Sequence, residues 1–487
     1  MNTQTYKNYD IGPDGRPVVH IDPGPAILYY ILTFGIILGI STWVVLTFPT
    51  GDSDDFFIIF TAWVNIIWGG LGFCYSLRRT GYSMLTLTYI FFLIFFGLIP
   101  FTVFRANRWT FGVMSNSDIP HIRYAMICTQ VCMLMTLVGY RFCPKNVRFS
   151  CYQWWAKREV VMSRIALALG TQVFFMLVLL YLIGTAGLIA SGAESEFVVE
   201  KSYALIVGLF VRPMMLFMGL FAWYGSRREG ETPGVKLCAW LMLGLGILAN
   251  LATSTTRFYS IFTVTAILFG VFPVLRRNSS FVMSYIFAGF AASPIAYQFR
   301  GLSSISELVQ MLKEFRFDQQ YVFGGNFDAF EMLTYAVSFV NDKGITWGRQ
   351  LFGVLLFWAP RSMWENKPVS TGELLGSNYI GISASLSNTN LSSPLSAEGF
   401  VNLGIVGVII IGFVYGCFCI WVDQLAEAPL RPRDTSGLGF ASAVFLPGIA
   451  ALSLIISRGS LMVGFSALCG ILAACYCASL FFLSKRV

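Results

Sequence analysis

The chain has 487 residues, of which 56% are apolar, 16% are aromatic and only 12% are charged, and its formal net charge is +8. This composition is too apolar for an ordinary water-soluble protein. Apolar runs long enough to cross a bilayer recur along nearly the whole chain, so we predict an all-α, polytopic integral membrane protein. Membrane topology accounts for much of the positive charge, and we expect no nucleic-acid partner.

The predicted spans follow a polar N-terminal stretch that is rich in proline and glycine. This stretch has no apolar centre, so we predict no cleavable signal peptide, and the first span would act as an uncleaved signal. Hydropathy predicts about twelve spans. In order they cover about 26–48, 56–77, 83–104, 122–141, 162–184, 203–224, 235–252, 258–275, 280–298, 401–423, 437–457 and 460–484.

The distribution of lysine and arginine between the connectors predicts the orientation. If the N-terminus is cytoplasmic, basic residues gather in the inward connectors, whereas the short outward connectors at 51–55 and 193–196 are acidic. Both termini are therefore predicted to be cytoplasmic. The inward basic set is Arg78, Arg79, Lys145, Arg148, Lys157, Arg158, Arg227, Arg228, Lys236, Arg276, Arg277, Arg431, Arg433, Lys485 and Arg486.

One long segment, 299–400, is neither a credible span nor a short connector, and the alternation places it outside the cytoplasm. Its part 350–359 is too short to cross, so we interpret it as an interfacial or re-entrant helix that ends at Pro360. The stretch 301–316 would form another helix on the membrane surface. No internal repeat is visible, so we predict one integral domain, 1–487, with the insert as the candidate active site.

The cysteines and histidines do not form a metal-binding pattern. The eleven cysteines include no CxxC pair and lie mostly in apolar runs, where cysteine behaves as a small hydrophobe. Only His20 and His121 are available for histidine chemistry. We therefore expect neither structural zinc nor a histidine-based metal site.

Two outward arginines, Arg257 and Arg458, lie at the mouths of spans and outside the topological pattern. They either anchor helix ends by snorkelling or form a paired site for a phosphate-rich group, because the planar guanidinium binds phosphate oxygens bidentately. Arg212 lies inside a span and needs a buried partner or a water-filled cavity. It either locks helices together or contacts a substrate.

The insert adds cations, carboxylates and aromatic rings on the same outward side. Such a set suits a pyrophosphate-linked substrate and acid–base work on a hydroxyl group. The rings would stack on sugars or form an ordinary interfacial belt. The charged candidates in this set are Arg300, Arg316, Arg349, Arg361, Lys367, Asp318, Asp328, Glu331, Glu365, Glu373 and Glu398, and the aromatic candidates are Tyr321, Phe323, Phe327, Phe330, Tyr335, Trp347, Trp358 and Trp364.

The C-terminal half resembles the Wzy-type oligosaccharide repeat-unit polymerases of bacterial surface polysaccharides. Thr-Ser-Thr-Thr-Arg-Phe at 253–258 is similar to the start of a helix in that family. Phe-Trp-Ala-Pro-Arg-Ser-Met-Trp-Glu-Asn-Lys-Pro at 357–368 and Ser-Ala-Glu-Gly-Phe-Val-Asn-Leu-Gly at 396–404 are similar to its Pro-Arg…Trp…Lys-Pro segment and the next span. Ile-Ser-Arg-Gly-Ser at 456–460 is similar to its last outward arginine.

The resemblance implies a glycosyltransferase of the C-type fold (GT-C) in the bacterial cytoplasmic (inner) membrane, with its active site facing the periplasm or exterior. Such enzymes move a growing glycan from undecaprenyl pyrophosphate to the non-reducing end of a new lipid-linked repeat unit. The implied partners are the undecaprenyl-pyrophosphate-linked donor and acceptor, the lipid bilayer and a chain-length regulator. No metal or other cofactor is implied.

The same resemblance assigns roles to individual residues. Arg257 and Arg458 would bind the pyrophosphate, and Arg361 and Lys367 would assist there or hold the loop in place. Asp328 is the first candidate for the base that accepts the proton of the acceptor hydroxyl. Further candidates are Glu331 and Glu398 for the base, Arg316 and Arg212 for the pyrophosphate, and Tyr321, Trp347 and Trp364 for sugar stacking.

Two alternatives remain. O-antigen ligases use a histidine in their long outward loop, and this insert contains none. A transporter, above all a flippase for lipid-linked sugars, would also have about twelve spans with both ends inside. Transporters usually show two similar halves, which this sequence does not.

Overall fold

The computed structural model describes residues 9–11, 17–19, 26–47, 55–106, 109, 111, 118–144, 154–155, 157–189, 207–228, 230–251, 257–298, 310, 313, 327–359, 361–380, 391–426 and 436–485. The regular elements among these residues are helices apart from four short strands. β1 (Tyr9–Ile11) pairs antiparallel with β2 (Pro17–Val19), and β3 (Arg158–Val160) pairs antiparallel with β4 (Leu483–Lys485).

Eight helical segments of the described residues are long and apolar enough to cross a membrane. Helices suit this task because each satisfies its own backbone hydrogen bonds without water. The segments are α1 (Ala26–Thr47), α2 (Phe56–Thr80), α3 (Met84–Leu93) continued by η2 (Ile94–Leu98) and α4 (Ile99–Ala106), α5 (Ile119–Phe142), η4 (Val207–Val211) continued by α9 (Arg212–Ser226), α18 (Leu395–Ala426), α19 (Gly437–Phe440) continued by η7 (Ala441–Phe445) and α20 (Leu446–Arg458), and α21 (Leu461–Phe482).

Four further apolar helices are shorter over the residues whose side chains are described. They are α7 (Ile165–Ile189), α10 (Pro233–Ala249), α11 (Arg257–Val271), which leads into the 3-10 turn η5 (Pro273–Arg277), and α12 (Ser279–Gln298). Each predicted span thus coincides with an apolar helix. The protein is an all-α, multi-pass membrane protein, and the total of twelve spans stays a prediction.

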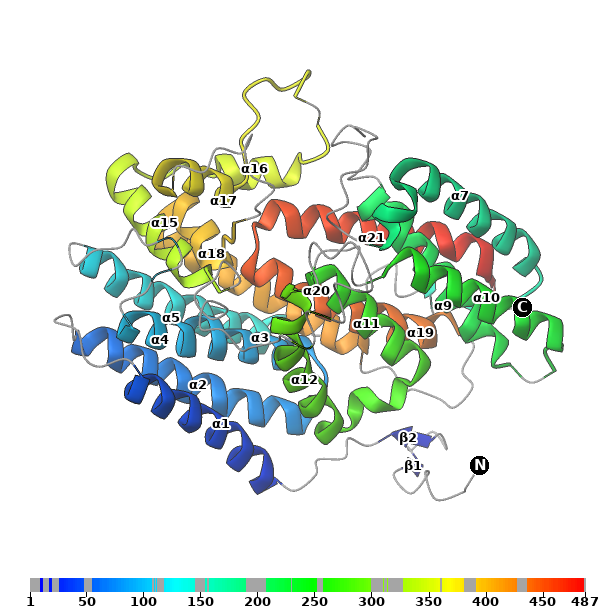
Figure 1. Ribbon diagram of the computed structural model, residues 1–487, viewed down its shortest axis with the longest axis horizontal. Coiled ribbons are helices and arrows are strands. Elements are labelled where there is room, and N and C mark those ends of the chain that lie inside the picture. The colour runs from blue at the N-terminus through cyan, green and yellow to red at the C-terminus, as the bar shows by residue number, and fades with distance from the viewer. Residues whose placement is uncertain are drawn as a thin grey trace.

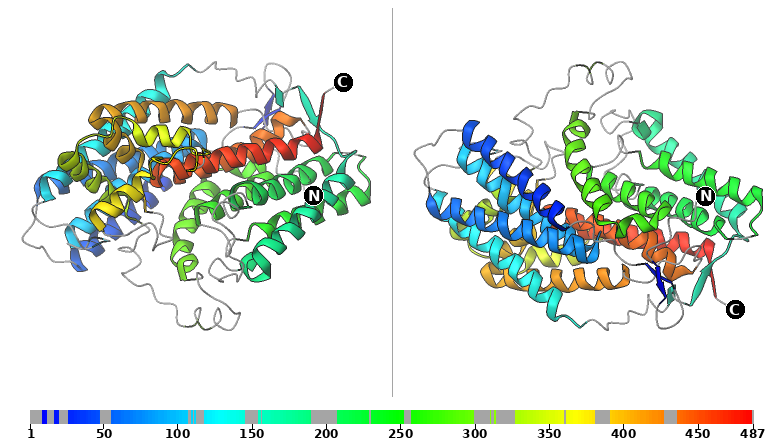
Figure 2. Two further views of the ribbon diagram at one scale, coloured as in Figure 1. Left: turned by 90° about the horizontal axis from the view of Figure 1, so that it is seen from above. Right: turned by 90° about the horizontal axis from the view of Figure 1, so that it is seen from below.

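The two largest apolar cores of the described helices meet at α20 (Figure 1). One core gathers α2, α3, α5 and α18, and the other gathers α9, α10, α11 and α21. α20 packs against α3 and α18 on one side and against α11 and α21 on the other. Both views in Figure 2 show the same division, with the blue and cyan helices apart from the green ones.

The closest helix pair is α5 with α18, because small residues line the crossing. A Cβ atom on Gly416 would lie 2.0 Å from the Thr136 carbonyl oxygen, and one on Gly139 would lie 2.2 Å from the Phe413 carbonyl oxygen. Gly412 and Gly416 stand four residues apart on α18, which is the small-xxx-small spacing typical of tightly packed membrane helices.

Contacts between connectors fall into two groups, one at each end of the fold. At one end the Tyr82 amide donates to the Arg276 carbonyl oxygen (2.9 Å), and β3 pairs with β4. At the other end the Arg123 Nε donates to the Asp55 carboxylate (2.9 Å). Each of these contacts joins connectors or adjoining helix ends that the basic-residue pattern assigns to the same side. Which end faces the cytoplasm stays a prediction.

The insert contains a buried helix that hydropathy did not single out. α15 (Ala329–Lys343) packs against α5 and α18 and buries its first eleven residues. Three shorter elements follow: α16 (Arg349–Leu355), then α17 (Thr371–Leu375) and the π-turn η6 (Gly376–Ile380). α16 overlaps the predicted interfacial segment 350–359 but ends at Leu355, before Pro360. The predicted surface helix at 301–316 lies outside the described residues apart from 310 and 313.

The predicted span 401–423 belongs to a helix that begins earlier. α18 starts at Leu395, inside the predicted insert, and breaks at Leu403 and Gly404. Gly404 has φ 60° and ψ −148°, a conformation that glycine reaches without a Cβ clash. The break therefore divides α18 into a short first part, which contains Glu398, and a long apolar part.

Candidate functional site

A buried ion pair joins the insert to the helices at the outward-predicted end. The Arg458 Nη2 lies 2.8 Å from the Asp328 Oδ1, and the two side chains are 10% and 1% exposed. The Ser392 amide donates to the second oxygen of Asp328 (3.1 Å). Asp328 stands at the N-cap of α15, where aspartate usually caps its own helix. Here its carboxylate is directed to Arg458 instead.

Glu398 forms the second half of this buried centre and is 1% exposed. The Leu461 amide, at the start of α21, donates to its Oε1 (2.8 Å), and the Thr371 hydroxyl donates to its Oε2. The two halves are joined by the chain, because Leu461 follows Arg458 by three residues. They are also joined by a hydrogen bond from the Ser393 amide to the Arg458 carbonyl oxygen (3.1 Å).

Four buried serines lie next to the residues that hold the two carboxylates. The hydroxyls of Ser393 and Ser460 interact with Glu398, whereas those of Ser392 and Ser396 have no hydrogen-bond partner among the described residues. Leaving a buried hydroxyl unpaired costs about 1–3 kcal/mol, so such a group calls for an explanation. All four side chains are at most 1% exposed. We call Ser392, Ser393, Ser396 and Ser460 the serine cluster.

The centre is chemically suited to an anion that carries several oxygens. It combines one guanidinium, the hydroxyls of the serine cluster and the N-terminal ends of α18 and α21. Helix N-termini and arginine both favour phosphate groups. Asp328 and Glu398 balance this positive potential in the structure and occupy its best donors. Both carboxylates are therefore held by protein donors in this state.

The third candidate base, Glu331, lies on α15 but in another environment. It is 3% exposed, and its Oε1 accepts hydrogen bonds from the Phe111 amide (3.1 Å) and from the Tyr335 hydroxyl (3.3 Å). Burial and the neighbouring Glu331 carboxylate raise the pKa of Tyr335 well above its ordinary value. The phenol therefore stays protonated and donates to Glu331.

Arg361 and Lys367 shape a turn of the insert. The Lys367 ammonium donates to the carbonyl oxygens of Phe357 (2.6 Å) and Ala359 (2.8 Å). Partial burial and the nearby Arg361 charge lower the pKa of Lys367. The exposed Arg361 guanidinium approaches the Lys367 carbonyl oxygen at 3.4 Å. Of the two roles predicted for this pair, these contacts serve the second, holding the loop in place.

Arg212 and Arg257 belong to the second core. Arg212 opens α9, is 7% exposed, and its carbonyl oxygen accepts a hydrogen bond from Asn250 (2.9 Å). Arg257 opens α11, and its side chain lies outside the described residues. α11 packs antiparallel to α20, since Gly270 lies against Val444 and Gly448 against Phe262. The start of α11 and Arg458 are therefore at the same end of the fold.

The predicted sugar-stacking and remaining pyrophosphate residues lie apart from the buried centre or outside the described residues. Trp364 packs edge-on against Phe352, with ring centroids 5.8 Å apart. Trp347 is 80% exposed. Tyr321 and Arg316 lie outside the described residues.

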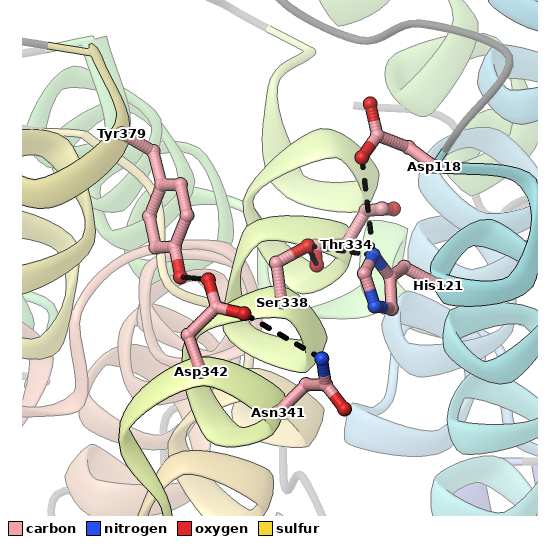
Figure 3. Close-up of polar contacts among 7 residues, drawn as sticks. All are labelled: Asp118, His121, Thr334, Ser338, Asn341, Asp342 and Tyr379. Carbon is pink, nitrogen blue, oxygen red and sulfur yellow. Dashed lines mark hydrogen bonds and ion pairs between the residues drawn. The ribbon is translucent and has the colours of Figure 1, made fainter.

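A second polar cluster was missed by sequence reasoning, which considered His121 only as a metal ligand. The His121 Nδ1 lies 3.1 Å from the Ser338 hydroxyl and 3.9 Å from the Asp118 carboxylate, and both contacts use the same ring nitrogen (Figure 3). Nearby, the Tyr379 hydroxyl donates to Asp342 (2.8 Å). The sequence placed His121 at the outward end of a span, but only the fold brings it to α15.

Helix geometry separates this cluster from the buried centre. Asp328 and Ser338 are ten residues apart along α15, which corresponds to about 15 Å at 1.5 Å per residue. Direct proton transfer needs heavy atoms within about 3 Å. His121 therefore lies too far along α15 to act on a group held between Asp328 and Arg458.

Comparison with protein-family models, with curated proteins and with solved structures found no match.

Proposed function

We propose that this protein polymerises oligosaccharide repeat units carried on undecaprenyl pyrophosphate, at the outer face of a bacterial cytoplasmic membrane. The observation that carries the proposal is the buried centre, in which Arg458 and the serine cluster meet Asp328 and Glu398. Polar donors buried within the helices of a membrane protein are costly, and they commonly mark a substrate site. The motif resemblance supplies the substrate class.

In the proposed reaction, a hydroxyl at the non-reducing end of the acceptor attacks the anomeric carbon of the donor glycan. The new glycosidic bond forms as the bond between that carbon and the pyrophosphate oxygen breaks. The lipid pyrophosphate leaves with the bonding electrons, and the hydroxyl proton passes to a base. Arg458 and the serine hydroxyls would stabilise the charge that develops on the leaving group, as preorganised donors do in other transfer reactions.

Substrate binding itself would prepare the base. When the Arg458 guanidinium turns to a phosphate oxygen, Asp328 loses the partner that now lies 2.8 Å away. A carboxylate without its opposite charge in a desolvated site is a better proton acceptor. Asp328 would thus exchange its contact with Arg458 for one with the acceptor hydroxyl only once the donor substrate is bound.

A flippase for the same lipid-linked sugars is the second candidate, and one observation favours it. The break of α18 at Leu403–Gly404 lies one turn beyond Glu398, and broken helices beside buried polar groups are typical of transporter binding sites. The ligase-like alternative is weaker, since His121 is separated from the buried centre along α15.

Arg458→Ala tests the proposal in cells whose only copy of the protein is the variant. We expect the surface glycan ladder to collapse to single capped repeat units while lipid-linked units are still exported. Arg227→Ala, which changes an exposed arginine of an inward-predicted connector, serves as the matched control and should keep the ladder. Loss of export would assign the protein to transport, and an unchanged ladder would remove Arg458 from the site.

A further inference from the structure

The segment around α16 exposes an unusual set of large apolar side chains. The most exposed are Trp347 (80%), Met363 (79%) and Trp358 (67%), followed by Leu355 (61%) and Phe352 (56%). We call these five residues the α16 face. In water such a surface is unfavourable, and exposed apolar patches of this kind mark interaction sites.

The backbone holds the first of these rings outward. Trp347 has φ 55°, a left-handed conformation that bulky residues rarely adopt. The turn is fixed on both sides, because the Thr346 amide donates to the Val401 carbonyl oxygen (2.9 Å) and the Gly348 amide donates to that of Asn402 (3.3 Å). The exposure of Trp347 is therefore built into a strained but well-anchored turn.

Basic side chains interleave with the α16 face. Arg349 donates to the Asn366 carbonyl oxygen (3.2 Å), so it lies close to the 361–367 turn that carries Arg361 and Lys367. Between Trp347 and Lys367 the only acidic residue is Glu365. Tryptophan together with arginine and lysine is the composition of a membrane–water interface, where rings sit at headgroup level and cations reach phosphates.

The α16 face adjoins the point where a span begins. A Cβ atom on Gly353 would lie 3.2 Å from the Met462 methyl, and Phe357 packs edge-on against Phe465 with centroids 6.0 Å apart. Both partners belong to the first turns of α21, a candidate span. α16 lies beside the start of α21, close to α17 (Figure 1).

We propose that the α16 face lies in the outer-leaflet interface, with its rings at the acyl boundary and Arg349 and Arg361 on the phosphates of anionic lipid headgroups. The charge of the segment selects this occupant, since the phosphate region of the bilayer is its electrostatic complement. The proposal does not depend on the polymerase assignment, because it concerns bilayer lipid rather than the transferred substrate.

A nitroxide label tests the depth of the α16 face. The Trp358→Cys substitution would be made in a protein whose reactive native cysteines have been replaced. The labelled protein would then be reconstituted in phosphatidylethanolamine–phosphatidylglycerol vesicles. We expect the label to collide more with oxygen than with a water-soluble nickel chelate. The matched position is Ser377→Cys on the exposed surface of η6, where nickel should dominate. Equal nickel accessibility at both positions would place the α16 face in water and overturn the proposal.

Two further readouts exclude the other occupants. Spin–spin broadening at position 358 that grows with protein density would assign the face to a second copy of the chain and reject the lipid proposal. Replacing phosphatidylglycerol by phosphatidylcholine should lower the melting temperature of the unchanged protein, and this shift should be smaller in Arg361→Gln. The same shift in both proteins would show that Arg361 does not contact the anionic lipid.

Discussion

At the residue scale, several groups of the buried centre lower the stability of the folded protein. The Asp328 carboxylate binds Arg458 and makes no capping hydrogen bond at the N-terminus of α15. In the serine cluster, the hydroxyls of Ser392 and Ser396 have no partner among the described residues. A buried ion pair contributes little net stability, although breaking it by removing one partner is costly. Natural proteins retain such arrangements where function requires them.

Ser396→Ala should therefore stabilise the folded protein and slow repeat-unit transfer. Removing a buried hydroxyl that lacks a partner among the described residues should raise the free energy of unfolding by about 1 kcal/mol. Repeat-unit transfer should fall because the phosphate site loses a donor. Melting in detergent and transfer to a lipid-linked acceptor measure the two effects.

Ser479→Ala is the matched control for that change. Ser479 is equally buried, but its hydroxyl donates to the Tyr476 carbonyl oxygen (2.6 Å). Its removal should lower stability by about 1 kcal/mol and leave transfer unchanged. If both variants lost the same amount of stability, the Ser396 hydroxyl would have a hydrogen-bond partner in the free protein. The interpretation that it waits for a phosphate oxygen would then be wrong.

At the element scale, the packing of α18 against α5 determines where the site lies. The close crossing at Gly139, Gly412 and Gly416 keeps the two helices side by side along their length. α15 then packs onto both helices near their outward-predicted ends. Asp328 and Glu398 reach one centre because their two helices are held in this way.

Gly416→Ala should be strongly destabilising, since its Cβ would lie 2.0 Å from the Thr136 carbonyl oxygen. Overpacking of this kind costs about 1–3 kcal/mol. At Gly39 on α1, where an added Cβ meets nothing within 4 Å, the same substitution should be neutral or stabilise by up to about 1 kcal/mol. Thermal melting in detergent compares the two, and equal shifts would argue against close packing at Gly416.

At the scale of the whole molecule, the contacts between connectors keep two ends apart. This separation agrees with the alternation of basic and acidic connectors along the chain. It brings the carboxylates of the insert and Arg458 to the same end. The cellular side of that end is a prediction from the basic residues alone.

Labelling of intact cells with a membrane-impermeant maleimide tests this orientation. Ser377→Cys, on the exposed surface of η6, should react from outside, whereas Lys485→Cys on β4 should react only after the membrane is opened. The reverse pattern would invert the topology and place the buried centre on the cytoplasmic side. A polymerase acting on exported repeat units could not then use it.

The sequence by itself determined that this is a multi-pass helical membrane protein, and each predicted span coincides with an apolar helix of the described residues. Both follow from sums over consecutive residues, since crossing a bilayer depends on local length and hydropathy. Arg458 was also recognised individually as a candidate, because an isolated charge at a span end stands out in an apolar chain. Asp328 was a candidate through the family resemblance, as one of several carboxylates in the insert.

Only the tertiary structure decided which of these residues meet. Arg458 and Asp328 are 130 positions apart, and His121 reaches Ser338 across 217 positions. α15 was overlooked as a core element because it is shorter than a span and carries charges at both ends. Such pairings depend on how whole helices pack. Packing depends on the facing surfaces of two helices that are far apart in the sequence, so no short stretch of the sequence contains this information.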